Sequence, residues 1–517
     1  MVGYDARFVT DASNNARLLD QSQPIREVWR QAWPTVLTMT SYTVMQFVDA
    51  LMVAQLGPLE LAAQGNGGIW SFVPIAFVFG VLSIVNTFVA QNLGAGRNRA
   101  VAMYGWGGLW VGFLSWILLL LPWAALMGPL FAIMGHDEDL RTLETRYAQI
   151  LLLGAIFVVS AKAMSHWFFG FQKPGVITIS AFVGNIVNIL ANYVLVFGEA
   201  GIPAIGLPGI PGTPQLGVLG AALGTVIGTA VEFLIPLVFY LGPKLNAEFA
   251  TRSAWRMGLG KPIGEILKVG FPPGVQISSE MICWALFMTV LVGAFGEDDM
   301  AAGWAVMRYL HFSFMPAVGF SVATTSLVGK WVGAGRPELA VSRTRISLTL
   351  AVLYMTLCGV IFIVFRYQLI GLFVSASVSE EEARQIIRIG GMMMLCGAFF
   401  QAMDAVGIVY TGALRGAGDT YWPGIVQVML VWVVMIGGGL LLMHLAPGLE
   451  SLGPWIAAMV YLLILGVAMA IRFEGGSWRR IDLLGSGEAG PSQGSNPNPQ
   501  DRPESASESP SNDWEAS

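Results

Sequence analysis

Charge is scarce in this sequence, and so are the residue types that build disulfides and metal centres. Only 12% of its 517 residues are charged, whereas about 25% is usual for a soluble domain. Its three cysteines and four histidines show no CxxC or HExxH spacing, so they predict neither a disulfide framework nor a metal site. We find no catalytic motif either, and we expect no enzyme, no cofactor and no nucleic-acid partner. The composition excludes an ordinary soluble domain.

Long apolar runs are what the sequence has in abundance, since 55% of its residues are hydrophobic. Runs long enough to cross a bilayer fall at 34–56, 66–90, 103–126, 146–168, 176–198, 216–242, 265–295, 303–329, 346–373, 386–414, 421–444 and 450–471. The first 32 residues are polar and contain no apolar core of a signal peptide. The sequence therefore predicts an all-α polytopic membrane protein with twelve transmembrane helices.

The chain divides by composition into five parts. We expect a cytoplasmic N-terminal segment (1–32), a first lobe (33–242), a cytoplasmic linker (243–263), a second lobe (264–472) and a disordered tail (473–517) rich in Ser, Pro, Gly and Glu. Basic residues gather in the N-terminal segment and in alternate loops, as at Arg97 and Arg99, while 57–65 and 199–215 lack Lys and Arg. Both termini should therefore be cytoplasmic, in a cell (inner or plasma) membrane.

An internal repeat relates the two lobes at an offset of 239 residues. Pro34 matches Pro273, and the tetrapeptide GAGR at 94–97 matches GAGR at 333–336. Without a gap, 34–97 and 273–336 share twelve identities over 64 positions. Because each lobe has six spans, both keep the same orientation. We expect two six-helix bundles around a central cavity, an architecture typical of transporters.

Four acidic residues lie inside the expected spans, namely Asp49, Glu232, Glu280 and Asp404. Charges within a span are rare and usually functional. The alternative is a structural ion pair, for instance with Lys162 or Arg308. The repeat does not duplicate these acids, because the 239 offset pairs Asp49 with Met288. The two lobes should therefore have different functional roles.

Polar residues of the first lobe share helix faces. Asn185, Asn188 and Asn192 follow an i, i+3, i+7 pattern, and Thr225 precedes Glu232 by seven residues. Together with Asp49, Asn188 and Thr225 would offer the oxygen ligands that suit Na⁺, or a proton site. The asparagine side chains could instead form hydrogen bonds between helices that only help the helices pack together.

Glu280 and Asp404 are the acids of the second lobe, and aromatic and methionine side chains are frequent around the expected pathway. Candidates for the pathway are Tyr42, Trp70, Trp284 and Met288. Carboxylates among aromatic faces would suit large organic cations through charge and cation–π attraction. Most aromatics in membrane helices pack or face lipid, so none is decisive alone.

Five segments together resemble the multidrug and toxic compound extrusion (MATE) family, nearest its NorM-type branch. They are MQFVDALMVAQLGPLELAA, VAQNLGAGR, NILANYVLVFG, GVLGAALGT and QAMDAVGIVYTGALRGAGDT. The resemblance implies a cation site of the first lobe at Asp49, Asn188, Asn192 and Thr225, and coupling acids at Glu280 and Asp404. Glu232 belongs to none of these motifs and could be a third coupling carboxylate.

The implied function is antiport, in which an organic cation leaves as Na⁺ or H⁺ enters by alternating access. We expect a monomer in the lipid bilayer. A flippase for lipid precursors or polysaccharides has a related architecture, but more spans and more buried basic residues would be expected. A narrow metabolite exporter is a further alternative, although acids in the pathway argue against anionic substrates.

Overall fold

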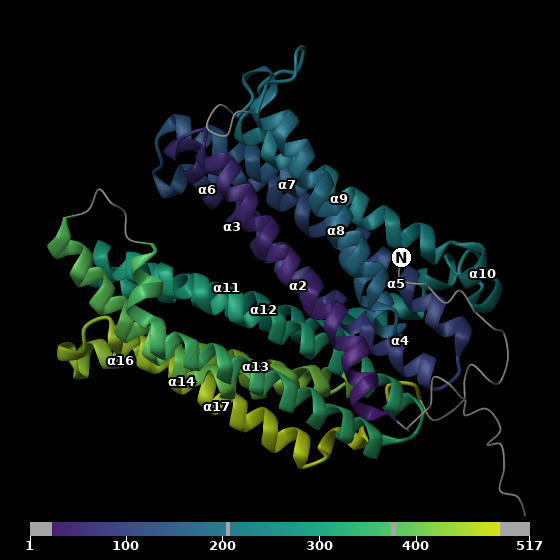
Figure 1. Cartoon of the computed structure of the whole chain (residues 1–517). Coiled ribbons are helices and arrows are strands. Elements are labelled where there is room, and N and C mark those ends of the chain that lie inside the picture. The colour runs from purple at the N-terminus through teal and green to yellow at the C-terminus, as the bar shows by residue number, and fades with distance from the viewer. Residues whose placement is uncertain (1–22, 203–206, 374–378, 486–517) are drawn as a thin grey trace, which may run out of the picture. The chain divides into compact units, whose positions relative to one another are not determined.

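The computed structural model describes residues 23–202, 207–373 and 379–485, and within these ranges the chain is helical and forms no β-strand (Figure 1). Twelve helical segments of this part are long and apolar enough to span a membrane. They are α2 (Pro24–Ala54), α3 with α4 (Pro58–Leu82, Ile84–Gly94), α5 with α6 (Asn98–Ser115, Leu121–Met134), α7 (Glu138–Gly170), α8 (Pro174–Asn192), α9 (Val218–Tyr240), α11 (Lys261–Leu286), α12 (Glu297–Gly333), α13 (Pro337–Gly371), α14 (Glu380–Ala417), α15 with α16 (Tyr421–Leu430, Gly438–Leu445) and α17 (Leu452–Glu474). The predicted fold class and span count are confirmed.

Local sequence signals set where these helices begin and end. Four of them start with a proline, whose missing N–H would have no helical partner at that position: α2, α3, α8 and α13. The Ser379 hydroxyl caps α14 by accepting from the Glu382 N–H (3.3 Å). At the other end of α14, Gly418 takes the left-handed conformation (φ 91°) that terminates a helix.

Wider π-helical turns interrupt several spans. One covers Tyr193–Phe197 directly after α8, and another covers Val431–Gly437 between α15 and α16. Subtracting 239 from the second range gives 192–198, so the two turns occupy equivalent places in the repeat. Such turns often mark functional positions, and the first follows Asn192 immediately.

The first helix of each half packs against the opposite half. α2 contacts α12 and α13, and α11 contacts α3 and α5. These pairs exchange with one another under the 239-residue offset, as expected for two same-sense halves around a pseudo-two-fold axis. Each half also has a large buried cluster, with Trp167 in one and Trp455 in the other, both 0% exposed.

The repeated glycines of the GAGR segments meet at this pseudo-axis. A Cβ on Gly94 would lie 2.0 Å from the Lys330 carbonyl oxygen, and a Cβ on Gly333 would lie 2.0 Å from the Gln91 carbonyl oxygen. Gln91 and Lys330 are themselves 239 residues apart. Only glycine permits backbones to approach so closely, which explains why both halves have it here.

The tail departs from its predicted disorder over the residues that the structure describes. Ser477–Arg480 form a short 3₁₀ helix, and the Trp478 ring is buried and stacks on Phe473 at 5.2 Å. Disorder from residue 473 was therefore wrong for this stretch, because an aromatic pair anchors it to α17. The remaining tail, 486–517, and most of the N-terminal segment, 1–22, lie outside the described residues.

Candidate functional site

Three helices bring the predicted residues of the first half together. Asp49 comes from α2, Asn188 and Asn192 from α8, and Thr225 from α9. The Asn192 amide donates to Asp49 Oδ1 at 2.7 Å, and the Asn188 amide lies 3.5 Å from Thr225 Oγ1. Asp49 is 7% exposed and both asparagines are at most 1% exposed. The four residues therefore form one polar cluster, buried except for the half-buried Thr225, hereafter the first-half cluster.

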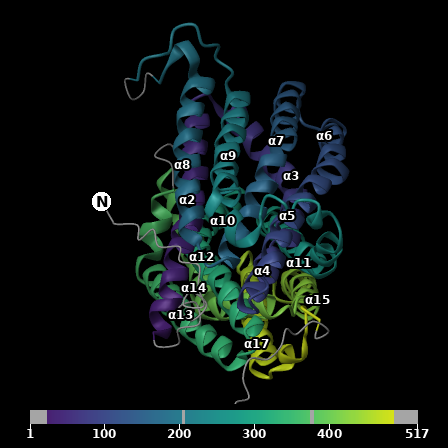
Figure 2. The same cartoon turned by 90° about the vertical axis from the view of Figure 1, so that its right-hand side faces the viewer.

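A stripe of small residues on α9 makes room for this cluster. α8 and α9 lie side by side (Figure 2). A Cβ on Gly224 would fall 2.0 Å from Asn192 Oδ1, and a Cβ on Gly228 would fall 2.7 Å from Asn188 Cβ. Glycines spaced by four residues occupy one face of a helix. The segment GVLGAALGTVIG thus creates the space into which the amides of α8 project.

The first-half cluster has more acceptors than donors. Among the described residues, Asn188 Oδ1 and Asn192 Oδ1 are buried with no hydrogen-bond donor nearby. Buried acceptors normally have a partner. Two unpartnered amide oxygens beside a carboxylate and a hydroxyl are the oxygen ligands that hard cations prefer. The predicted cation site and the packing alternative therefore involve the same side chains, and two of their oxygens have no protein partner within the part of the chain that the structure describes.

A second polar pair, half-buried at Tyr42, lies two helical turns away along α2 and α9. The Tyr42 hydroxyl donates to the Glu232 carboxylate, which is 8% exposed. The Asn185 amide donates to the Ser41 carbonyl oxygen at 3.1 Å. Asn185 therefore links α8 to α2 and does not enter the first-half cluster, although it shares a face with Asn188.

The acids of the second half lie among α11, α14, α15 and α17. Glu280 accepts from the Gln427 amide at 2.7 Å and from the Tyr461 hydroxyl at 3.4 Å. Gln276 in turn donates to the Gln427 side chain. Asp404 is 9% exposed, and its carboxylate lies near enough to that of Glu280 for two negative charges there to repel each other. These groups are hereafter the second-half cluster.

None of the four predicted acids takes part in an ion pair closer than 4.0 Å within the described ranges. Glu232 does interact electrostatically with Lys162, but without a contact ion pair. Lys162 instead lies over the Phe79 ring (4.8 Å), and Arg308 over the Phe373 ring (5.7 Å). Neither of the structural ion pairs considered from the sequence is formed as a contact within 4.0 Å. A buried carboxylate without such a contact is costly unless it holds a proton, binds a cation or faces water.

The predicted pathway residues other than Tyr42 fall in different surroundings. Trp284 lies against the Glu280 carboxylate and packs edge-on to Phe287 at 5.4 Å. The Trp70 carbonyl oxygen accepts from the Trp123 indole at 3.0 Å. Met288 is 0% exposed within the second-half core, which is the position of a packing residue.

Several polar residues of these clusters were not predicted from the sequence. Gln427 and Tyr461 stand alone in apolar helices, and only their depth could have signalled them. Glu144 was also missed, because it precedes the expected start of its span. It is wholly buried, binds the Asn66 amide at 3.0 Å and pairs with His136 at 2.7 Å. No group of three or more His, Cys, Asp or Glu side chains suited to a metal occurs in the described part.

Twelve spans in two related halves, with unpaired acids buried in each, define a multi-pass membrane transporter. A family model described as MatE matches residues 34–194 and 278–440, one match in each half. The chain belongs to the MatE family, whose members are transporters and not enzymes.

Curated relatives and solved structures agree with this assignment. The chain is similar to a protein of Deinococcus radiodurans named probable multidrug resistance protein NorM, with 28% identity over 89% of this chain and 97% of the relative. A protein of the same name from Pseudomonas aeruginosa is 26% identical over 89% and 90%. A transporter structure of the MOP superfamily from Pyrococcus furiosus superposes with a TM-score of 0.77 at 20% identity, covering 89% of this chain and 97% of that chain. A eukaryotic MATE transporter gives 0.75 at 18%, covering 88% and 97%.

Proposed function

We propose that the protein is a secondary multidrug antiporter, which exports organic cations in exchange for Na⁺ or H⁺ by alternating access. The observation that carries the proposal is that both halves bury carboxylates, Asp49 in the first and Glu280 and Asp404 in the second, that form no ion pair within 4.0 Å among the described residues. The names of the relatives support multidrug export. The coupling ion would bind and leave these carboxylates as the two halves change access.

Differential affinity is what couples the ion to the drug. A cation that binds the outward-open state more tightly than the inward-open state shifts the balance between them. In the first-half cluster, Asp49 supplies the charge, and the oxygens of Asn188, Asn192 and Thr225 supply neutral ligands. Na⁺ would use this whole set, whereas H⁺ would need only the carboxylate.

Organic cations suit the second-half cluster. Glu280 and Asp404 provide negative charge, while Trp284 and Tyr461 place aromatic rings beside Glu280. Cation–π attraction adds to the charge term for large amphiphilic cations. The proposal also assigns the chain to a cell membrane, with cytoplasmic termini, and to a monomer that binds no nucleic acid.

Ethidium efflux from everted vesicles tests this function. Efflux should accelerate when either a Na⁺ or an H⁺ gradient is imposed, and the effective gradient identifies the coupling ion. The double variant Glu280→Ala/Asp404→Ala should lose most gradient-driven efflux. Wild-type rates in that variant would remove both acids from the mechanism.

Two alternatives are separated by simple measurements. A flippase for lipid precursors would be expected to have more spans than the twelve found in the described ranges, and it would move a fluorescent diphosphate lipid between leaflets. A narrow metabolite exporter would transport one member of a substrate panel and ignore ethidium. Neither alternative explains several unpaired buried acids as directly as cation antiport does.

A further inference from the structure

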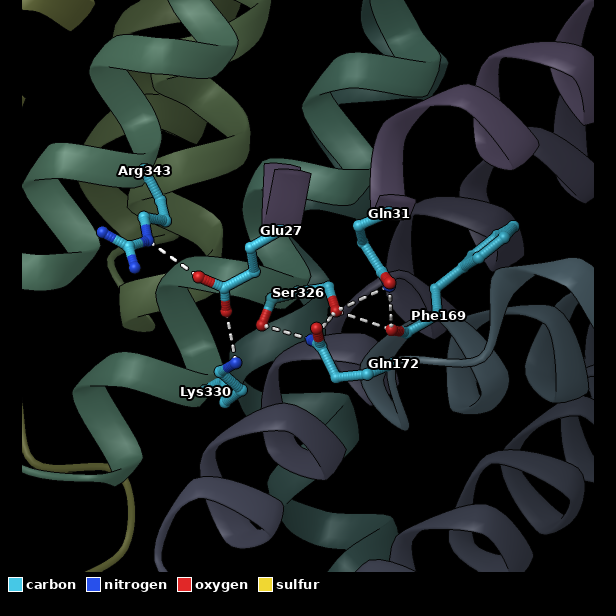
Figure 3. Close-up of polar contacts among 7 residues, drawn as sticks. All are labelled: Glu27, Gln31, Phe169, Gln172, Ser326, Lys330 and Arg343. Carbon is cyan, nitrogen blue, oxygen red and sulfur yellow. Dashed lines mark hydrogen bonds and ion pairs between the residues drawn. The ribbon is translucent and has the colours of Figure 1, made fainter. Parts of the chain in front are cut away.

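A third polar group joins the two halves near the GAGR segments, since its Lys330 precedes Gly333 by three residues. Figure 3 shows its side chains. Glu27, in the first turn of α2, belongs to the first half by sequence. Its carboxylate binds Lys330 of α12 and, at 2.8 Å, the Arg343 Nε of α13, both in the second half. These three residues are separate from the clusters around Asp49 and Glu280.

The three charges are buried. The side chains of Lys330, Arg343 and Glu27 are 4%, 3% and 10% exposed. Both cations also face the Trp331 ring, at 4.4 and 5.5 Å. A buried ion pair contributes little net stability when intact, but removing one partner leaves an uncompensated charge and is strongly destabilising. In the closed structure, the Glu27 carboxylate therefore compensates the buried positive charges of Lys330 and Arg343. If this end opened, water would solvate these two charges instead.

A network of neutral hydrogen bonds continues the same contact. The Gln31 amide, one turn further along α2, donates to the Phe169 carbonyl oxygen at 2.9 Å and to Ser326 Oγ at 3.3 Å. Gln172 donates to the Ser326 carbonyl oxygen at 3.1 Å. Figure 3 shows these groups beside the charged triad. Residues of α2, α7 and α12 are thus joined across the two halves at one level.

In the described residues, the pseudo-equivalent place in the other half has a different and more exposed set of polar contacts. Arg343 corresponds to Tyr104 at the 239 offset, and the Tyr104 hydroxyl donates to Glu265 of α11. Glu265 also lies 3.4 Å from Lys261, whose side chain is 81% exposed. Near this position the first half therefore has a phenol and a solvated lysine, whereas the second half contributes two buried cations.

We propose that Glu27, Lys330 and Arg343 form an ionic latch that holds this end of the protein closed, and that opening this end requires Glu27 to separate from the two cations. The inference rests on the proposed alternating access for its role in transport, but the latch itself is a property of the closed structure. Substrate and coupling ion are not needed to test it.

Alkylation of a single reporter cysteine tests the latch. Ala90 of α4 is 0% exposed and faces Gly329 of α12 across the two halves. Ala90→Cys is introduced after Cys283, Cys358 and Cys396 are replaced by alanine. The rate of maleimide labelling is then measured on purified protein in detergent, where neither membrane orientation nor transport affects the result.

Glu27→Gln should raise the labelling rate about tenfold or more. The matched control Glu265→Gln, at the pseudo-equivalent contact, should change it less than twofold. Adding Lys330→Met and Arg343→Met to Glu27→Gln should return the rate toward that of the reporter protein, because no charge is then left buried without a partner.

Melting temperatures of all variants separate latch opening from general unfolding. Equal labelling rates for Glu27→Gln and Glu265→Gln would overturn the latch. So would faster labelling that tracks a fall in melting temperature, or that persists when both cations are removed. Loss of ethidium transport with an intact latch would instead count against the proposed function alone.

Discussion

At the scale of single residues, the substitution Asp49→Asn separates the effect of the negative charge from the effect of side-chain shape. Asp49→Asn keeps the size of the side chain and an acceptor for the Asn192 amide but removes the negative charge. Gradient-driven ethidium efflux should fall at least tenfold, because the coupling cation loses its counter-charge.

Stability should respond in the opposite direction. A lone buried carboxylate is unfavourable, so the melting temperature of Asp49→Asn should equal or exceed that of the wild type. Full efflux in this variant would contradict the role of Asp49, and a large fall in melting temperature would indicate a structural role.

Tyr42 and Glu232 make a different prediction. Tyr42→Phe removes the hydroxyl that donates to the buried Glu232 carboxylate. An unsatisfied buried group costs about 1–3 kcal/mol, so this variant should unfold at a lower temperature. Glu232→Gln retains an acceptor for Tyr42 and should melt close to the wild type. If both variants melt alike, the hydrogen bond is not what holds α2 to α9 here.

At the scale of helices, the α8–α9 contact depends on α9 having no side chain at Gly224. Gly224→Ala would put a methyl group 2.0 Å from Asn192 Oδ1, which forces Asn192 away from Asp49. Overpacking of this kind costs about 1–3 kcal/mol, and efflux should fall together with the melting temperature.

Gly68→Ala is the matched control for this substitution, since nothing lies within 4 Å of its added Cβ and it is also helical. It should transport normally. A Gly224→Ala protein that behaves like Gly68→Ala would show that α8 and α9 can separate without disturbing the first-half cluster.

Spacing within one helix was predictable from sequence, and contacts between helices were not. The heptad-like separation of Asn185, Asn188 and Asn192 correctly indicated a shared face on α8. It could not show that Asn185 binds the α2 backbone, that Asn192 binds the Asp49 carboxylate of α2, and that Asn188 turns toward Thr225 of α9. The rotation of each helix about its own axis is set by the helices that pack against it. A uniformly apolar span contains no pattern from which that rotation could be predicted.

The same limit explains Gln427 and Tyr461. Each is a single polar residue in an apolar span, and a lone residue has no periodicity that could assign it to a face. The four intramembrane acids were easy to find because charge is so rare in the spans. Charged residues near helix ends, such as Glu27, look ordinary in sequence, and only the structure shows that Glu27 is buried between halves.

At the scale of the whole molecule, the duplication has kept the scaffold and changed the chemistry. Identical glycines at 94 and 333 meet the same carbonyl positions across the pseudo-axis. The polar groups have diverged instead, since Asp49 corresponds to Met288 and Arg343 to Tyr104. Symmetry therefore governs how the halves touch, whereas asymmetry determines what each half binds.

This symmetry makes a quantitative prediction. Gly94→Ala and Gly333→Ala each place a methyl group 2.0 Å from an opposing carbonyl oxygen, so each should destabilise the contact by a similar amount, about 1–3 kcal/mol. Once one substitution has moved the two backbones apart, the methyl group of the other substitution clashes less with its opposing carbonyl oxygen. The double variant should therefore lose less stability than the sum of the single losses, as neighbouring sites commonly do. Thermal unfolding of the three variants in detergent measures this coupling. Strictly additive losses would mean that the two glycines act at independent contacts and that the halves do not share one axis at the GAGR segments.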